Sequence, residues 1–134
     1  MQSEVTCNER RYMARYSYAQ QVQKELGITQ LGLALLTAIG ADEGRPLSFY
    51  ADRLGVTPAT ASRAMYYLTE KESRHGALEF VERRLFVDPS SGLPNNRCKA
   101  HYLTDKGRGT ARRFIAIFAG EEDDSLLLPR SSAA

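Results

Sequence analysis

The chain has 134 residues, which is the size of one compact domain. Hydrophobic residues make up 43% and charged residues 25%, a composition typical of globular proteins and too apolar for general disorder. Eighteen basic side chains against sixteen acidic ones leave a net charge of +2, which excludes a histone-like or a strongly acidic protein. The first residues lack the apolar segment of a secretory signal, and the longest apolar run, residues 31–39, is too short to span a bilayer. Two cysteines cannot form a disulfide scaffold, so we expect a cytoplasmic protein without a membrane partner.

The charges are distributed unevenly along the chain. Residues 121–134 carry −3 and the first 120 residues carry +5, while residues 74–113 alone also carry +5. Basic charge grouped in one segment indicates a nucleic-acid partner better than the total does, although such a run is more often only a solvated face. The motifs around the basic segment must therefore decide between a nucleic-acid partner and a solvated face.

Two helices are predicted near the start of the chain. A capping box begins at Thr6, and aromatic and apolar residues then recur every three or four positions up to Gly27. This pattern predicts a helix over residues 6–26. A second helix is expected to begin at Thr29, where flanking apolar residues form a hydrophobic staple, and to end near Gly40.

The next stretch has the spacing of a helix-turn-helix. A short helix over 47–54 is followed by Gly55, which permits a tight turn, and by Thr57 and Pro58, which suit the start of another helix. The small side chain of Ala51 lets the two helices cross closely. An ordinary pair of packed helices is the alternative, but the mutually consistent offsets favour a helix-turn-helix that binds DNA.

We expect the outward face of the second helix, residues 57–75, to contact the major groove. Small side chains near its start let the helix sit deeply, hydroxyl groups can bond bases or phosphates, and Arg63 can bond a guanine bidentately. The DNA-contacting residues predicted on this helix are Thr57, Ala59, Thr60, Ser62, Arg63 and Tyr66.

Residues 80–103 are expected to form a β-hairpin. Strand-forming residues at 80–87 and 97–103 flank a segment rich in turn residues. The basic side chains of this hairpin that we predict to contact DNA are Arg84, Arg97 and Lys99. A last helix is predicted over 104–120, followed by an acidic tail, residues 121–134, that we expect to be disordered.

These elements, taken in order, have the layout of a winged helix-turn-helix, a mainly α fold with a small β-hairpin wing (α+β). The runs Leu54-Gly-Val-Thr-Pro-Ala-Thr-Ala-Ser-Arg63 and Leu103-Thr-Asp-Lys-Gly107 resemble the MarR family of bacterial transcriptional regulators. The resemblance covers about residues 29–120, with a longer junction at 72–78 and a longer wing tip than is usual. It implies that the second motif helix enters the major groove, that the wing reaches the minor groove and that Arg97 corresponds to the family's wing arginine. The function it implies is a sequence-specific regulator of transcription, a repressor, that binds double-stranded DNA and is associated with the bacterial nucleoid when bound.

The resemblance also implies a homodimer in which the terminal helices interlock across a two-fold axis. Two recognition helices would then lie about one DNA turn apart on a near-palindromic site. Residues 1–120 would form one domain, with 47–103 as the DNA-reading unit and with 6–26 and 104–120 as dimerisation helices. In the alternative, both helices complete a monomeric core. The predicted interface residues are Tyr12, Tyr16, Ala19, Leu26, Phe114, Ile115 and Phe118.

Some members of the family bind small aromatic ligands between the dimer helices and the reading unit, or sense oxidants through a cysteine. Cys7 is the redox candidate because tyrosines follow it on the same helix, with an inert surface cysteine as the alternative. No HExxH, GxSxG or regular Cys/His spacing is present, so we expect no enzyme, metal or cofactor. A second hypothesis is a winged-helix structural or interaction module of a plasmid or phage replication or partition complex.

Overall fold

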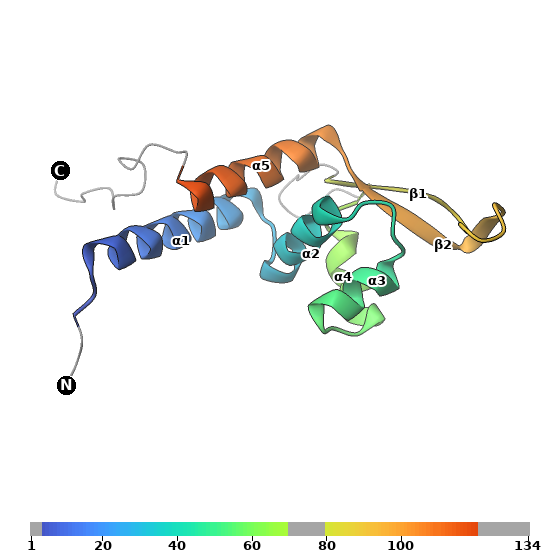
Figure 1. Ribbon diagram of the computed structural model, residues 1–134, viewed down its shortest axis with the longest axis horizontal. Helices are drawn as coiled ribbons and strands as arrows, with labels where there is room; N and C mark the ends of the chain where they lie inside the picture. The colour runs from blue at the N-terminus through green and yellow to red at the C-terminus, as the bar shows by residue number, and fades with distance from the viewer. Residues whose placement is uncertain (1–3, 70–79, 121–134) are drawn as a thin grey trace.

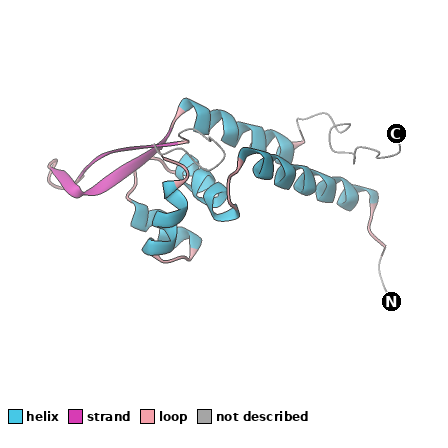
Figure 2. Cartoon of the chain, turned by 180° about the vertical axis from the view of Figure 1, so that it is seen from behind, coloured by secondary structure: helices cyan, strands magenta, loops and turns pink. Residues whose placement is uncertain are grey.

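The computed structural model describes residues 4–69 and 80–120. Its elements are, in chain order, α1 (Cys7–Leu26), α2 (Gln30–Ala41), α3 (Leu47–Leu54), α4 (Pro58–Tyr66), β1 (Val81–Val87), β2 (Pro94–Leu103) and α5 (Asp105–Ala119). Helices α1 and α5 lie side by side in one layer, α2, α3 and α4 pack below them, and the hairpin projects from the end opposite the start of α1 (Figures 1 and 2). This is the expected α+β winged helix-turn-helix. The acidic tail lies outside the described residues.

Threonine caps begin four of the five helices. Thr6, Thr29, Thr57 and Thr104 each accept a hydrogen bond from the backbone N–H three residues later. This bond satisfies one of the free donors of a first helical turn and contributes about 1 kcal/mol. The predicted starts of these four helices are confirmed.

The main hydrophobic core is built around α2. Leu35, Leu36 and Ile39 of that helix have no measurable exposure, and they pack with buried side chains of α3, α4 and the hairpin. Phe80, which precedes β1, reaches this core, and its carbonyl group contacts Gly107 so closely that a Cβ could not fit there. The absence of a side chain at Gly107 therefore lets the first turn of α5 pack directly against the backbone of Phe80.

A second, smaller cluster joins α1 to α5. Its buried members are Ala19, Val22, Phe114 and Ile117. Two leucines, Leu26 and Leu33, are half-buried and touch both clusters, which makes the two cores continuous. In Figures 1 and 2 the amino-terminal part of α1 extends beyond the end of α5.

The hairpin is longer on its second strand than the sequence indicated. Strand β2 begins at Pro94 rather than at residue 97, because Pro94 and Asn95 pair with the end of β1. The register then jumps, with Leu85 opposite Lys99 and its neighbour Phe86 opposite Asn95. The three residues 96–98 therefore have no partner on β1 and bulge out of the ladder.

Helix α4 is shorter than expected. The predicted helix over 57–75 is wrong at residues 67–69, which are not helical, while residues 70–75 lie outside the described part of the chain. The backbone N–H groups of Tyr67 and Leu68 bond three residues back, which tightens the helix end. The Leu68 carbonyl then accepts hydrogen bonds from Phe80 and Val81, both of 2.8 Å. This long-range pairing ends the helix, and no local sequence signal reveals it.

Candidate nucleic-acid interface

The helix-turn-helix presents one face of α4 to solvent. Ala61 and Met65 point into the core, and the other side of the helix is open. All six residues predicted on this helix are exposed: Thr57, Ala59, Thr60, Ser62, Arg63 and Tyr66. The buried Ala61 and Met65 are four residues apart and lie on one side of the helix, so the six predicted residues lie on the sides that face away from the core.

Two hydroxyl groups at the start of α4 are arranged by the helix cap. The Thr57 hydroxyl accepts the Thr60 N–H at 3.2 Å and donates to the Thr60 hydroxyl at 2.9 Å. The Thr60 hydroxyl therefore keeps its own proton free for an outside acceptor. At the other end of the helix, the rings of Tyr66 and Tyr67 meet edge to face at 5.3 Å. The entrance of the helix is thus small and polar, while its exit is aromatic.

The wing places its basic residues in different surroundings. Arg84 pairs with Glu82 at 3.1 Å and stacks over the Tyr102 ring at 4.4 Å. The hydrogen bond to Arg84 lowers the pKa of the Glu82 carboxyl. Lys99 is exposed opposite Leu85. Arg97 lies in the bulge of β2, and its side chain is outside the described set.

The tip of the wing is held by one carboxylate. Asp88 accepts hydrogen bonds from the backbone N–H of Ser90 at 2.9 Å and from its hydroxyl at 2.8 Å. These bonds lower the pKa of Asp88. The N–H of Gly92 bonds the Asp88 carbonyl at 2.7 Å, and Gly92 itself has a positive φ of 69°. The tip is a defined turn that fixes how far the wing reaches.

A histidine locks the base of the wing to the helix-turn-helix. His101 is 3% exposed, and both its backbone N–H and its Nδ1 lie within hydrogen-bond distance of the Arg45 carbonyl, at 3.2 and 3.0 Å. The Gly44 N–H donates back to the His101 carbonyl at 2.8 Å. Burial lowers the pKa of His101, so the ring is neutral and donates from Nδ1. Tyr50 packs edge-on against this ring and donates its hydroxyl to the Asp42 carbonyl at 2.7 Å.

Sequence reasoning missed two exposed arginines beside this lock. Arg45 precedes α3 and Arg53 lies in its last turn, and both stack on the ring of Phe49. The spacing of four residues between Phe49 and Arg53 was a readable signal, because residues so spaced meet on one helix face. The surface that joins α4 to the wing is therefore basic as well.

The seven residues predicted for a dimer interface divide into two groups. Ala19 and Phe114 are buried in the contact between α1 and α5 of the same chain, so their side chains do not lie on its surface. Leu26 is half-buried in that contact as well. The exposed members are Tyr12 (64%), Tyr16 (50%), Ile115 (59%) and Phe118 (52%). The sequence pattern could not separate the two apolar faces of α5, of which one packs on α1 through Ile117.

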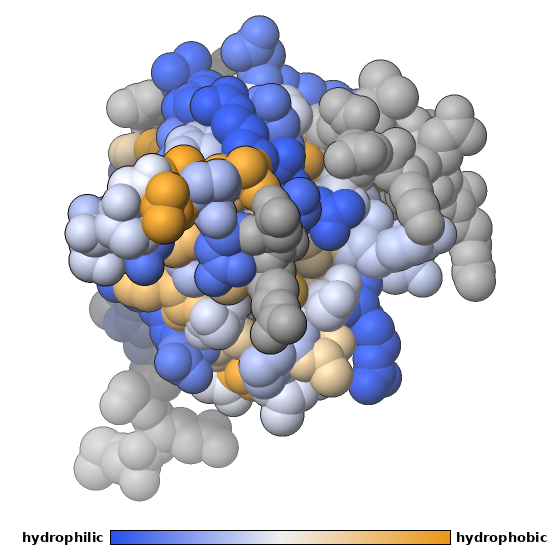
Figure 3. Space-filling view, turned by 90° about the vertical axis from the view of Figure 1, so that its right-hand side faces the viewer, coloured by the Kyte–Doolittle hydropathy of each residue, from blue (hydrophilic) through white to orange (hydrophobic). Residues whose placement is uncertain are grey.

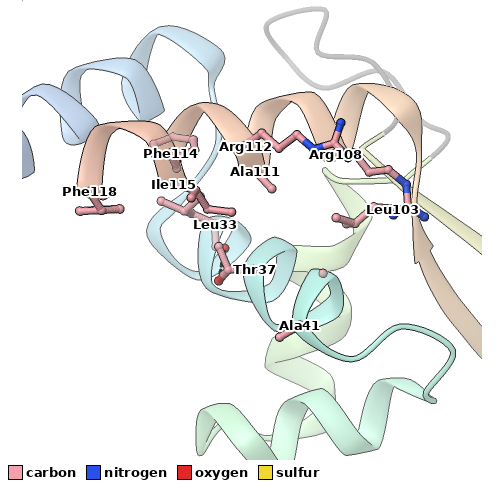
Figure 4. A pocket seen from close by; sticks show the side chains of 11 residues that line it. Leu33, Thr37, Ala41, Leu103, Arg108, Ala111, Arg112, Phe114, Ile115 and Phe118 are labelled. Carbon is pink, nitrogen blue, oxygen red and sulfur yellow. Dashed lines mark hydrogen bonds between the residues drawn. The ribbon is translucent and has the colours of Figure 1, made fainter. Parts of the chain in front are cut away.

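A groove of about 450 Å³ runs between α2 and α5 (Figure 4). Leu33 and Thr37 of α2 face Ile115 and Phe118 of α5 across it, and Arg108 and Arg112 line its other end. Arg108 is paired with Glu43 at 3.0 Å.

Cys7, the redox candidate, is exposed in the first turn of α1, and Cys98 is half-buried in the wing. Among residues 4–69 and 80–120, no group of three or more metal-ligating side chains lies together. Within the same residues, no helix has both the length and the apolar character needed to cross a bilayer.

Comparison with solved structures identifies the fold. A MepR–DNA complex from S. aureus superimposes with a TM-score of 0.63 at 23% identity, covering 82% of this chain and 80% of that one. A MarR-family transcriptional regulator from Silicibacter pomeroyi gives 0.54 at 23% identity, covering 92% and 73%. The transcriptional repressor CouR, bound to a 23-mer DNA duplex, gives 0.54 at 19% identity, covering 94% and 85%. No protein-family model and no curated protein sequence matches the chain. The chain thus has the winged helix-turn-helix fold seen in MarR-type regulators.

Proposed function

We propose that this chain is a MarR-type transcriptional repressor that binds double-stranded DNA sequence-specifically in the cytoplasm. The observation that carries the proposal is the exposed face of α4, where small and hydroxylated side chains surround Arg63 beside an exposed basic wing. A helix with this profile fits the major groove, and its arginine can read a guanine. Two structurally similar proteins, MepR and CouR, were solved with DNA, which favours this function over an enzyme or a module of a replication or partition complex.

We assign the roles within this proposal as follows. Residues 47–103 read DNA, with α4 in the major groove and the hairpin at the adjacent minor groove, and residues 57–66 now define the recognition helix with its cap. The wing contacts remain Arg84, Arg97 and Lys99. Of these, Lys99 is the one with an exposed side chain and no ion pair to a described residue.

We further propose a homodimer on a near-palindromic site. The exposed Tyr12, Tyr16, Ile115 and Phe118 supply the apolar surface of its interface, while Ala19, Leu26 and Phe114 support that surface from behind.

The groove between α2 and α5, beside Ile115 and Phe118, is the place we assign to a small aromatic ligand, because its lining is mostly apolar with Arg112 at one end. Heat released on adding benzoate to the protein would check this assignment. If the protein senses oxidants, we propose Cys7 as the residue that is oxidised. Unchanged DNA affinity after mild peroxide treatment would contradict a redox role for Cys7.

The experiment that tests the main proposal is a selection of binding sites from random duplexes. The wild-type protein should enrich one near-palindromic sequence. The variant Arg63→Ala should lose the preference at one base pair in each half-site, a loss of about 1–3 kcal/mol in discrimination. Lys99→Ala is the matched control, since a phosphate contact weakens all sequences equally. An Arg63→Ala variant that keeps the full preference would contradict the assignment of α4.

A further inference from the structure

Phe49 of α3 holds two arginine side chains on the surface. The guanidinium carbon of Arg45 lies 4.9 Å from the centre of the ring and that of Arg53 lies 4.8 Å from it. Both arginines are exposed, whereas Phe49 is half-buried and packs against the main core. Cation–π contacts of this kind fix two mobile side chains beside one anchored ring. We call Arg45 and Arg53 the arginine pair.

The arginine pair lies between α4 and the wing. Helix α3 packs against both α4 and β2. The backbone of Arg45 is bonded to His101 at the base of the wing. A hollow of about 610 Å³ opens here, and its lining includes Arg45, Phe49, Leu85 and Tyr102. Viewed towards the wing end, the surface alternates between strongly hydrophilic areas and small hydrophobic ones (Figure 3).

The acidic side chains around the hollow are occupied. Asp42 pairs with Arg45 at 3.3 Å, and Glu43 pairs with Arg108 at 3.0 Å. Arg53 makes no ion pair with any residue in the described part of the chain, although the exposed Asp52 is its neighbour in sequence. Arg53 is therefore a cation that the ring of Phe49 holds in position and whose N–H groups can bind an outside anion. Arg45 is a second positioned cation, and Asp42 is the one carboxylate that it pairs with.

We propose that the arginine pair binds backbone phosphates of the DNA strand that passes from the groove read by α4 to the groove reached by the wing. The proposal rests on the proposed function. A duplex that touches both elements must lay its backbone across the surface between them, and such contacts fix the register of a protein on DNA. Guanidinium groups bind phosphate oxygens bidentately, and the apolar floor of Phe49 and Leu85 suits the deoxyribose between two phosphates. The stacking on Phe49 holds both cations in place before DNA arrives.

The test measures how DNA affinity depends on salt. The full-length protein is titrated into a fluorescein-labelled duplex of random sequence at several salt concentrations, and anisotropy gives the affinity. The double variant R45A/R53A should weaken binding by about tenfold, and the slope of log affinity against log salt should flatten by about two, because each lost phosphate contact removes about 0.9. Arg113→Ala, an exposed arginine on α5, is the matched control and should leave the slope unchanged.

Two further variants separate phosphate binding from a general effect of charge. Arg53→Lys keeps the cation and should keep most of the slope. Asp42→Asn frees Arg45 from its carboxylate and should tighten binding a few-fold with a steeper slope.

An R45A/R53A protein that is folded by circular dichroism and keeps the wild-type slope of log affinity against log salt would contradict phosphate binding by the arginine pair. In that case Arg63→Ala still reports on the proposed function, because it alone changes sequence preference. A wild-type protein that binds no duplex would overturn both proposals.

Discussion

The helix-turn-helix core and the layer made by α1 and α5 bury their apolar side chains to different extents. In the core, Leu35, Leu36, Ile39, Tyr50 and Phe80 are all 1% exposed or less. In the terminal layer only four apolar side chains are buried, and Tyr12, Met13, Tyr16, Ile115 and Phe118 each remain at least half exposed. Large apolar side chains gathered on one surface mark an interaction site rather than a finished core. The reading unit is thus buried within one chain, and the exposed apolar side chains of the terminal layer are what supports the proposed homodimer.

The largest expected effect lies in the core. Leu36→Ala should lower the free energy of unfolding by about 2–5 kcal/mol, because the lost side chain leaves a cavity between α2 and the helix-turn-helix. Urea denaturation followed by circular dichroism measures this. Leu93→Ala is the control: that side chain is 66% exposed at the wing tip, so its change should stay within about 0.5 kcal/mol. Equal losses in the two variants would show that the core is not the stabilising part of the fold.

The second effect lies in the terminal layer. The double variant I115A/F118A should raise the dimer dissociation constant by about 10- to 100-fold, the usual result of removing central apolar side chains from an interface. Sedimentation over a range of concentrations measures it. Leu85→Ala, another exposed apolar side chain but on the wing, should leave the constant unchanged. A wild-type protein that is monomeric at micromolar concentration would contradict the proposal that the terminal layer is a dimer interface.

The smallest effect concerns the lock between the core and the wing. Burial holds the pKa of His101 below the value of about 6.5 that the ring has in an unfolded chain. Above that pH both states are neutral and stability is unaffected. As the pH falls below it, the unfolded chain binds the proton first, so stability is lost towards the lower folded pKa. Thermal melting between neutral pH and mild acid should show this decline.

His101→Gln should remove most of that pH dependence, since no proton is then taken up at the position. His75→Gln, the same change at the other histidine of the chain, should leave the dependence in place. If both variants keep the wild-type decline, the acid sensitivity arises elsewhere.

The sequence was sufficient for features that depend on near neighbours. The threonine caps, the αL glycine after α1 and the buried Ala51 and Ala61 were all predictable, because each follows from residues within one or two helical turns. The fold class and the exposed face of α4 follow from them.

Features that depend on distant partners were not predictable. Helix α4 ends where Leu68 meets Phe80, and the bulge in β2 arises from pairing across the hairpin. Which apolar face of α5 is buried depends on how α1 packs against it, so Ile117 was missed and Phe114 was given a role outside the chain. His101 gave no signal in the sequence, because its two partners lie on the backbone of another element.

The double hydrogen bond at the Leu68 carbonyl has a consequence for how this protein could vary. The carbonyl joins the exit of α4 to the entry of β1 through the backbone N–H groups of Phe80 and Val81. Because the donors and the acceptor all belong to the backbone, the apolar side chains at these two positions could be exchanged for others of similar size while the recognition helix and the wing keep their relation. A proline at either position would remove one of the donors and loosen that relation.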